Sequence, residues 1–145
     1  MVDIINLPEG AQFECNLADL PSALAEKIIL HLPKAEEPHY CLVSRFYLGV
    51  HVYVVTRYRV VDSMVYIRQG MMEFEQKGDN YSKSILLSEI IGIEHFEATG
   101  EKKKQYYVLT LHSHLRDDFS LSFNNKEFFL KFVGEIVSFA NKEKK

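Results

Sequence analysis

The sequence predicts a mainly β protein closed by one amphipathic C-terminal helix, and three observations predict it. From Tyr40 onward apolar residues recur at every second position, which is typical of strands. Two such runs, 105–114 and 119–123, are joined by the short polar segment 116–118, which predicts a hairpin. After Asn124 the apolar spacing changes to three and four residues, which indicates a helix.

The first eighteen residues show no clean periodicity, but a helix is predicted after them. Pro21 suits the first turn, Asp19 or Ser22 can provide the cap, and Pro33 ends the element. One stripe of apolar residues at helical spacing can then be buried: Leu24, Ala25, Ile28, Ile29 and Leu32. Because isoleucine and leucine suit either state, a strand over 27–32 is the alternative.

The central part of the chain is predicted to be a series of strands. In the first of them, one parity holds Val50, Val52, Val54, Tyr58 and Val60, and the other holds His51, Tyr53, Arg57 and Arg59. This alternation predicts one buried face and one wetter face. Further strands are predicted over 64–69, 71–76 and 84–98, the last as one strand or as two broken near Ser88 or Gly92. Turns are predicted at Gly70, 77–80 and 100–104.

The C-terminal helix has both a start signal and a face to bury. Asn124 and Glu127 have the spacing of a capping box. The apolar stripe consists of Phe129, Phe132, Val133, Ile136 and Ala140, widened by Phe128, Val137 and Phe139. Since burial of each large apolar side chain contributes about 1.5–3 kcal/mol, this helix is expected to dock on a sheet.

Length and composition favour one domain of 145 residues, with residues 1–24 as an arm or short helix packed on a domain of 25–145. The net charge of −3 argues against nucleic-acid binding. The acidic start lacks the features of a secretory signal, and no apolar run could span a bilayer, so a cytoplasmic protein is expected. Cys15 and Cys41 are then interpreted as two buried, reduced thiols.

Several short motifs add a resemblance to a known family. Between two runs of β-forming residues lies Thr56-Arg57-Tyr58-Arg59, with Gly70 after the next strand, the apolar segment 85–90 further on, and Glu26-Lys27-Ile28-Ile29 upstream. In this pattern the chain, over about residues 25–141, resembles bacterial pleckstrin-homology-like (PH-like) domains. The resemblance implies a partly open barrel or sandwich of two nearly orthogonal antiparallel sheets, with the helix plugging one open end. Such a widely shared fold implies a class of protein and no mechanism.

Eukaryotic relatives that bind phosphoinositides carry a basic cluster between their first two strands. The matching turn here, 44–49, contains one basic residue, Arg45. Specific inositide binding is therefore not expected.

Lys102-Lys103-Lys104 forms a basic run in a predicted loop. Clustered lysines attract an anionic membrane by about 1 kcal/mol each near its surface. Glu97 and Glu101 lie close in sequence and offset this charge. A solvated hairpin loop is the simpler interpretation, and an anion or membrane contact is the alternative.

His112 and His114 lie two residues apart, a spacing that places both on one strand face and can bind a metal when a third ligand converges. The possible third ligands are Asp117, Asp118, His51 and His95. Both histidines have the parity opposite to Leu109 and Leu111, so a hydrated strand face is the simpler interpretation. No metal or other cofactor is expected.

A second candidate strip consists of His51, Tyr53, Arg57 and Arg59 on the wetter face of one strand. Such a strip could bind an anion or a peptide. Cross-strand pairing of the arginines with Glu73 or Glu75 is the alternative. Of the neighbouring Met71 and Met72, one is expected to face the core.

No catalytic motif is present, so a binding protein is expected rather than an enzyme. The first hypothesis is a module that recognises a protein partner, or itself, through a sheet edge or the strand-loop end. The second is a membrane-surface module that uses Lys102, Lys103 and Lys104. The third is a small-ligand or metal-binding barrel, or a minor enzyme that uses His112 and His114.

Overall fold

A computed structural model describes residues 3–34, 36–73, 81–100 and 104–143. In chain order the elements are β1 (Gln12–Glu14), a 3-10 helix η1 (Leu17–Asp19), α1 (Ser22–Ile29), β2 (Pro38–Phe46), β3 (Gly49–Thr56), β4 (Arg59–Arg68), β5 (Met71–Glu73), β6 (Tyr81–Leu86), a second 3-10 helix η2 (Leu87–Glu89), β7 (Ile90–Thr99), β8 (Gln105–Ser113), β9 (Phe119–Phe123) and α2 (Lys126–Glu143). Within the described ranges no helix is long and apolar enough to cross a bilayer.

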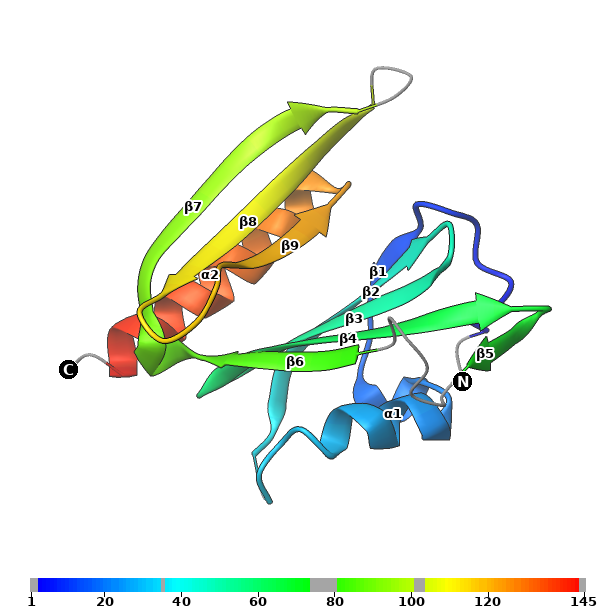
Figure 1. Ribbon diagram of the computed structural model, residues 1–145, viewed down its shortest axis with the longest axis horizontal. Helices are drawn as coiled ribbons and strands as arrows, with labels where there is room; N and C mark the ends of the chain where they lie inside the picture. The colour runs from blue at the N-terminus through cyan, green and yellow to red at the C-terminus, as the bar shows by residue number, and fades with distance from the viewer. Residues whose placement is uncertain (1–2, 35, 74–80, 101–103, 144–145) are drawn as a thin grey trace.

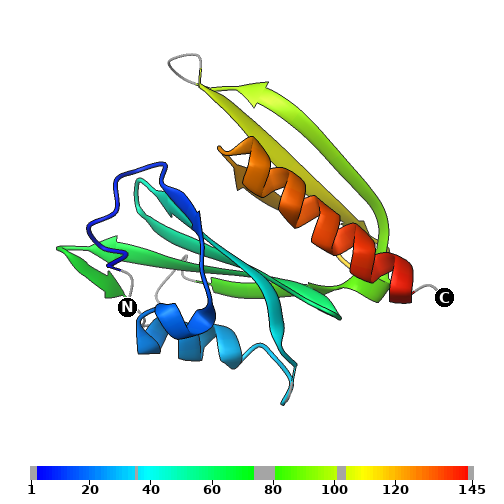
Figure 2. The same cartoon turned by 180° about the vertical axis from the view of Figure 1, so that it is seen from behind.

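The strands form two antiparallel sheets, which confirms a mainly β fold. Sheet A has the order β1-β2-β3-β4-β5, and β6 pairs with the first half of β4. Sheet B has the order β7-β8-β9. The two sheets diverge from the corner where β6 continues through η2 into β7, and α2 lies across sheet B (Figures 1 and 2). The break predicted near Ser88 is this corner.

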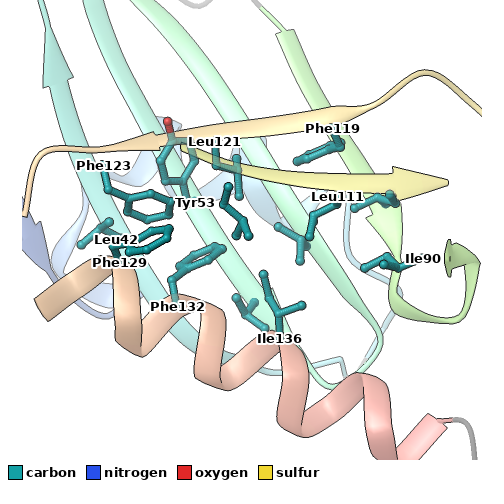
Figure 3. Close-up of a cluster of buried hydrophobic side chains, with 14 of the residues drawn as sticks. Leu42, Tyr53, Ile90, Leu111, Phe119, Leu121, Phe123, Phe129, Phe132 and Ile136 are labelled. Atoms are coloured by element: carbon teal, nitrogen blue, oxygen red, sulfur yellow. The ribbon is translucent and has the colours of Figure 1, made fainter. Parts of the chain in front are cut away.

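The main core lies between the two sheets and α2 (Figure 3). Its most buried members from sheet B and α2 are Leu109, Leu111, Leu121, Phe123, Phe132 and Ile136. The alternation predicted for β8 and β9 is confirmed, because β9 is buried at every second residue. The ring of Phe132 contacts those of Phe123 and Tyr53 at centroid distances of 5.3 and 6.0 Å.

A second core covers the opposite face of sheet A. The N-terminal segment and α1 contribute Ile4, Leu20, Leu24 and Ile28, which pack against a row of valines in β3 and β4. The helix over 22–29 is confirmed, so the alternative of a strand over 27–32 is wrong. Ile29 was expected in the buried stripe but is 52% exposed.

Because the two cores cover both faces of sheet A, the prediction of a wetter face along residues 50–60 is wrong. The period-two run over 50–60 is also not one strand. It is a hairpin of β3 and β4, in which Val55 pairs with Val60 across a turn at Arg57 and Tyr58. Tyr53 is only 3% exposed.

The structure also differs from the prediction at β1 and in helix α2. Residues Gln12–Glu14 form β1, an edge strand paired with β2, where no periodicity was expected. The α2 cap is Asn125 rather than Asn124, since the Phe128 N–H donates to Asn125 Oδ1 at 3.1 Å. Asn124 instead ties α2 to β1, because its N–H donates to Gln12 Oε1 at 2.8 Å. Val137 does not widen the buried stripe, because it is 39% exposed.

The turn predictions agree with the structure where it describes them. Gly70 has φ +73°, a conformation that favours glycine. Met72 packs on the second core and Met71 is 70% exposed, as expected for neighbours in a strand. The predicted turn at 77–80 lies outside the described residues, and so do residues 74–76 of the strand predicted over 71–76 and residues 101–103 of the turn predicted over 100–104.

Candidate functional site

The four residues of the predicted strip on β3 and β4 do not share a surface. Tyr53 lies inside the main core, where its hydroxyl accepts a hydrogen bond from the Ser122 N–H at 3.4 Å. His51 is half-buried, and its Nδ1 lies 2.8 Å from Oδ1 of the buried Asp62. The interpretation of these two residues as part of an exposed anion- or peptide-binding strip is therefore wrong.

Arg59 is held by a buried carboxylate. Its Nε donates to Glu36 Oε1 at 2.9 Å, and the Glu36 side chain is only 5% exposed. The Thr56 hydroxyl also donates to Glu36 Oε1 and accepts hydrogen bonds from the Tyr58 and Arg59 N–H groups, each at 3.1 Å. Arg59 therefore pairs with Glu36, and this cluster closes the β3–β4 turn. Of the partners expected for the arginines, Glu75 and the side chain of Glu73 lie outside the part of the chain that the structure describes.

Two predicted cationic positions remain at the surface. Arg57 is exposed, and its guanidinium lies 5.5 Å from the ring centroid of its neighbour Tyr58. Lys104 is exposed at the start of β8, where its carbonyl accepts the Gly100 N–H at 2.8 Å and closes the hairpin turn. Lys102 and Lys103 lie outside the described residues.

The β2–β3 turn offers no free basic cluster. Arg45 Nη1 donates to the carbonyl oxygens of Phe46 and Gly49, the latter at 2.8 Å. The guanidinium therefore holds its own hairpin together.

His112 lies between two carboxylates on the outer face of sheet B. Its Nδ1 is 2.7 Å from Asp118 Oδ1, and its Nε2 is 3.3 Å from Glu94 Oε2. The hydrogen bond to Asp118, followed by the contact with the Glu94 carboxylate, raises the pKa of His112 above its usual value. His114 follows the end of β8 in an exposed loop, so the expectation that both histidines share a strand face is wrong. Among the described residues no group of three or more His, Cys, Asp or Glu side chains could hold a metal ion.

A buried carboxylate at the corner between the sheets was not anticipated. Glu89 is 2% exposed and accepts hydrogen bonds from the Leu86 N–H at 2.8 Å and the Ser113 hydroxyl at 2.9 Å. Arg116 completes the cluster through Nε at 3.1 Å and Nη2 at 3.0 Å. Burial acts to raise the pKa of Glu89, but the hydrogen bonds and the positive charge of Arg116 outweigh it and lower the pKa. The cluster joins β6, η2 and the loop after β8.

The outer edge of β7 is the longest open strand edge that the structure describes. β7 pairs with β8 on one side, and no described strand pairs with its other side. Both ribbon views show β7 at the margin of the molecule, with α2 on the far side of β8 (Figures 1 and 2). Ile91 is 66% exposed and Phe96 is 52% exposed along this strand. An open ten-residue edge with exposed apolar side chains can pair with another chain.

A cavity of about 640 Å³ lies beside β1 and β2. Its lining includes Cys15, Asn16, Asp19, His39 and Tyr40. A smaller cavity of about 220 Å³ lies where β1 approaches β9, and Gln12 and Phe123 are in its lining. In the part of the chain that the structure describes, neither lining holds a group of three or more His, Cys, Asp or Glu side chains that could bind a metal ion.

Comparison with known proteins decides the fold. No protein-family model matches the sequence, and no curated protein matches it. A crystal structure of a DUF1696 family protein with a pleckstrin-homology domain from Shewanella loihica PV-4 superposes with a TM-score of 0.58, at 16% identity, over 90% of this chain and 98% of that one. This chain has a PH-like fold. The resemblance drawn from Thr56-Arg57-Tyr58-Arg59 and the apolar segment 85–90 is thereby confirmed at the level of the fold.

In this PH-like fold two of the motifs that carried the resemblance have structural roles. Thr56 and Arg59 bind Glu36 and close a turn, and the 85–90 segment turns the corner between the sheets. Glu89 could have been noticed as a carboxylate within an apolar run, which signals a buried partner. Its pairing with Arg116 could not be predicted, because sequence spacing alone does not show that Arg116 lies at that corner.

Proposed function

We propose that this chain is a non-catalytic PH-like binding module that pairs through the open edge of β7 with a polypeptide, either a protein partner or a second copy of itself. The observation that supports this proposal is the ten-residue strand β7, which is paired on one side only among the described strands. The backbone groups along such an edge point to solvent and can form a new ladder with an incoming strand.

The side chains of β7 suit a specific docking site. Ile91 and Phe96 offer exposed apolar surface that an added strand would cover. Glu94 and Glu97 place negative charges on the same strand, and charges on an edge oppose unspecific pairing. An added strand would therefore gain backbone hydrogen bonds along its length and specificity from the side chains beside it.

The experiment combines sedimentation velocity over a range of concentrations with hydrogen exchange of residues 90–99. Concentration-dependent association is expected to slow amide exchange in β7. Ile91→Lys and Phe96→Lys are expected to weaken association, because lysine on an edge strand opposes pairing. Leu30→Lys is the matched control, since Leu30 is 85% exposed at the end of α1 and far from β7 in sequence.

Two results would contradict the proposal. The contact would lie elsewhere if the chain associates without slower amide exchange in β7, and if Leu30→Lys weakens association as much as the β7 variants do. A chain that stays monomeric at every concentration would exclude self-pairing, and a photo-crosslinking residue at position 91 would then test a protein partner in the cell. The absence of any crosslink at that position would exclude pairing at β7.

A second candidate function is contact with an anionic membrane through the tip of the β7–β8 hairpin. One observation favours it: Lys104 is exposed at the base of this tip, and the strands that lead to it carry Phe96 and Tyr106, which are 52% and 37% exposed. The strand register pairs Ala98 with Tyr106, so Phe96 and Tyr106 face the same outer side of sheet B. Aromatic side chains beside lysines are suited to a membrane–water interface.

A further inference from the structure

The two cysteines of the chain lie side by side on neighbouring strands. Cys15 directly follows β1, and Cys41 is in β2. Their Sγ atoms are 3.7 Å apart, and the Cys15 N–H donates to the Cys41 carbonyl oxygen at 3.1 Å. This contact continues the β1–β2 register beyond the pairing of Glu14 with Leu42. Both thiols are free.

The two thiols differ in their access to solvent. Cys41 is 4% exposed and belongs to the second core. Cys15 is half-buried. Both cysteines line the cavity of about 640 Å³, together with Asn16 and Asp19. Because Cys15 is the more exposed of the two, a small oxidant in this cavity would meet Cys15 first.

The strand geometry permits a bond between them without a large movement of the backbone. Facing residues at a hydrogen-bonded position of an antiparallel pair have Cα atoms about 5.5 Å apart. Disulfides span Cα separations of about 4.4–6.8 Å. Closing the sulfur–sulfur distance to the bonded value of about 2.05 Å requires mainly rotation of the two short side chains.

We infer that Cys15 and Cys41 form an oxidisable dithiol, which a small hydroperoxide converts to a disulfide that fastens the N-terminal segment to sheet A. The Cys15 thiolate attacks one peroxide oxygen, the O–O bond breaks, and Cys15 becomes a sulfenic acid while the hydroperoxide leaves as an alcohol or water after protonation. The Cys41 sulfur then attacks Cys15 Sγ and loses its proton, and the sulfenic hydroxyl leaves as water. Two thiols are oxidised by two electrons, and one hydroperoxide is reduced.

The pKa values of the two thiols assign the roles of attacking and resolving thiol in the same order as their exposure to solvent. The hydrogen bond between the two thiols lowers the pKa of Cys15, although burial and the charge of Asp19 act against this. The same hydrogen bond, together with burial, raises the pKa of Cys41. Cys15 is therefore the attacking thiol and Cys41 the resolving thiol, since the thiolate is the nucleophile.

The disulfide would change how firmly β1 is held. β1 has three residues and pairs only with β2 among the described strands. The segment before α1 also places Ile4 and Leu20 in the second core. In the reduced chain β1 is held by noncovalent contacts, among them its pairing with β2, the hydrogen bond from the Asn124 N–H to Gln12 and the ion pair of Glu14 with Lys131. In the oxidised chain a covalent bond at the end of β1 keeps it there.

The test treats the reduced, full-length chain with hydrogen peroxide at neutral pH, and then denatures it and labels free thiols with a maleimide. A monomer that takes up no label, has lost the mass of two hydrogen atoms and regains both thiols with dithiothreitol is expected. Slower amide exchange over residues 11–16 and a higher Tm are expected for this oxidised monomer. The inference would be overturned if both thiols still took up the label after oxidation, or if disulfides formed only between molecules.

Single variants separate the two roles. In Cys41→Ser the peroxide is expected to leave Cys15 as a sulfenic acid that reacts with dimedone, and in Cys15→Ser Cys41 is expected to keep its thiol. Circular dichroism of the reduced variants checks that each is folded. If Cys41 oxidises as fast as Cys15, the assigned order is wrong. If the disulfide forms but exchange over residues 11–16 does not slow, the fastening of β1 is wrong.

Discussion

Arg59 and Glu36 form an ion pair at 2.9 Å, although they are 23 positions apart in the chain. The pair joins the first residue of β4 to the loop that follows α1. Its carboxylate is almost fully buried and also accepts the Thr56 hydroxyl. The contact therefore connects the N-terminal helix to the turn of the central hairpin.

Removal of the Arg59 side chain is expected to destabilise the chain. Arg59→Met leaves the buried Glu36 carboxylate without its charged partner, and an unsatisfied buried group of this kind costs about 1–3 kcal/mol. Urea unfolding followed by circular dichroism measures the loss. Arg57→Met is the matched control, because Arg57 is exposed and its change is expected to stay within about 0.5 kcal/mol. Equal losses in the two variants would show that the pair contributes no specific stability.

Glu89 is expected to make stability depend on pH in the acid range. Its pKa is lowered in the folded chain, so its contribution is present above the unfolded value of about 4.3 and is lost as the pH falls through the folded pKa. Glu89→Gln is expected to be less stable than the wild type at neutral pH, with the difference shrinking below about pH 4. Urea unfolding at several pH values measures this. A difference that does not change with pH would contradict the assignment.

The main core is expected to depend strongly on Phe132. Its side chain is fully buried between Tyr53 and Phe123, so Phe132→Ala is expected to lower the free energy of unfolding by about 3–5 kcal/mol. Leu130 lies two residues away on the same helix and is 55% exposed, so Leu130→Ala is the control. A similar loss in both variants would mean that α2 is stabilised by helix formation rather than by its docking.

The part of the fold that the sequence predicts well is the part in which each strand buries one face. In β9 the residues Phe119, Leu121 and Phe123 are buried, and the serines between them are exposed, so the period of two is visible. Sheet A differs because its two faces are covered by two cores. In sheet A, Tyr53 is buried although the residues of the same parity in its run are polar. The alternation of apolar and polar residues therefore does not predict which side chains of this sheet are exposed.

The ion-pair partner of Arg59 could not be predicted from the sequence for a related reason. Sequence spacing suggested Glu73 or Glu75 as partners for Arg59, but its partner is Glu36, which a loop of distant sequence brings to the turn. β1 is three residues long, too short to show any period. Its position on β2 is what places Cys15 beside Cys41, so the contact between the thiols is also invisible in the sequence.

The pKa of His112 is expected to fall when Asp118 loses its charge. The hydrogen bond to Asp118 is the main cause that raises this pKa, so Asp118→Asn is expected to move the titration of His112 toward lower pH. The raised pKa implies a contribution to stability that is present below about pH 6.5 and is lost as the pH rises through the folded value. NMR titration of the imidazole protons measures it, with the exposed His114 as an internal reference. An unchanged titration of His112 would contradict the hydrogen bond.

Charge reversal at the β7–β8 hairpin tests the membrane candidate. If Lys102, Lys103 and Lys104 contact a membrane, the chain is expected to sediment with anionic vesicles and not with neutral ones, and the bound fraction is expected to fall as salt is raised. Replacement of all three by Glu is expected to abolish binding. A second triple variant, Lys34→Glu, Arg57→Glu and Arg68→Glu, changes the net charge equally at exposed positions outside sheet B. Equal losses in the two variants would indicate unspecific attraction, and no binding by the wild type would leave β7 pairing as the remaining proposal.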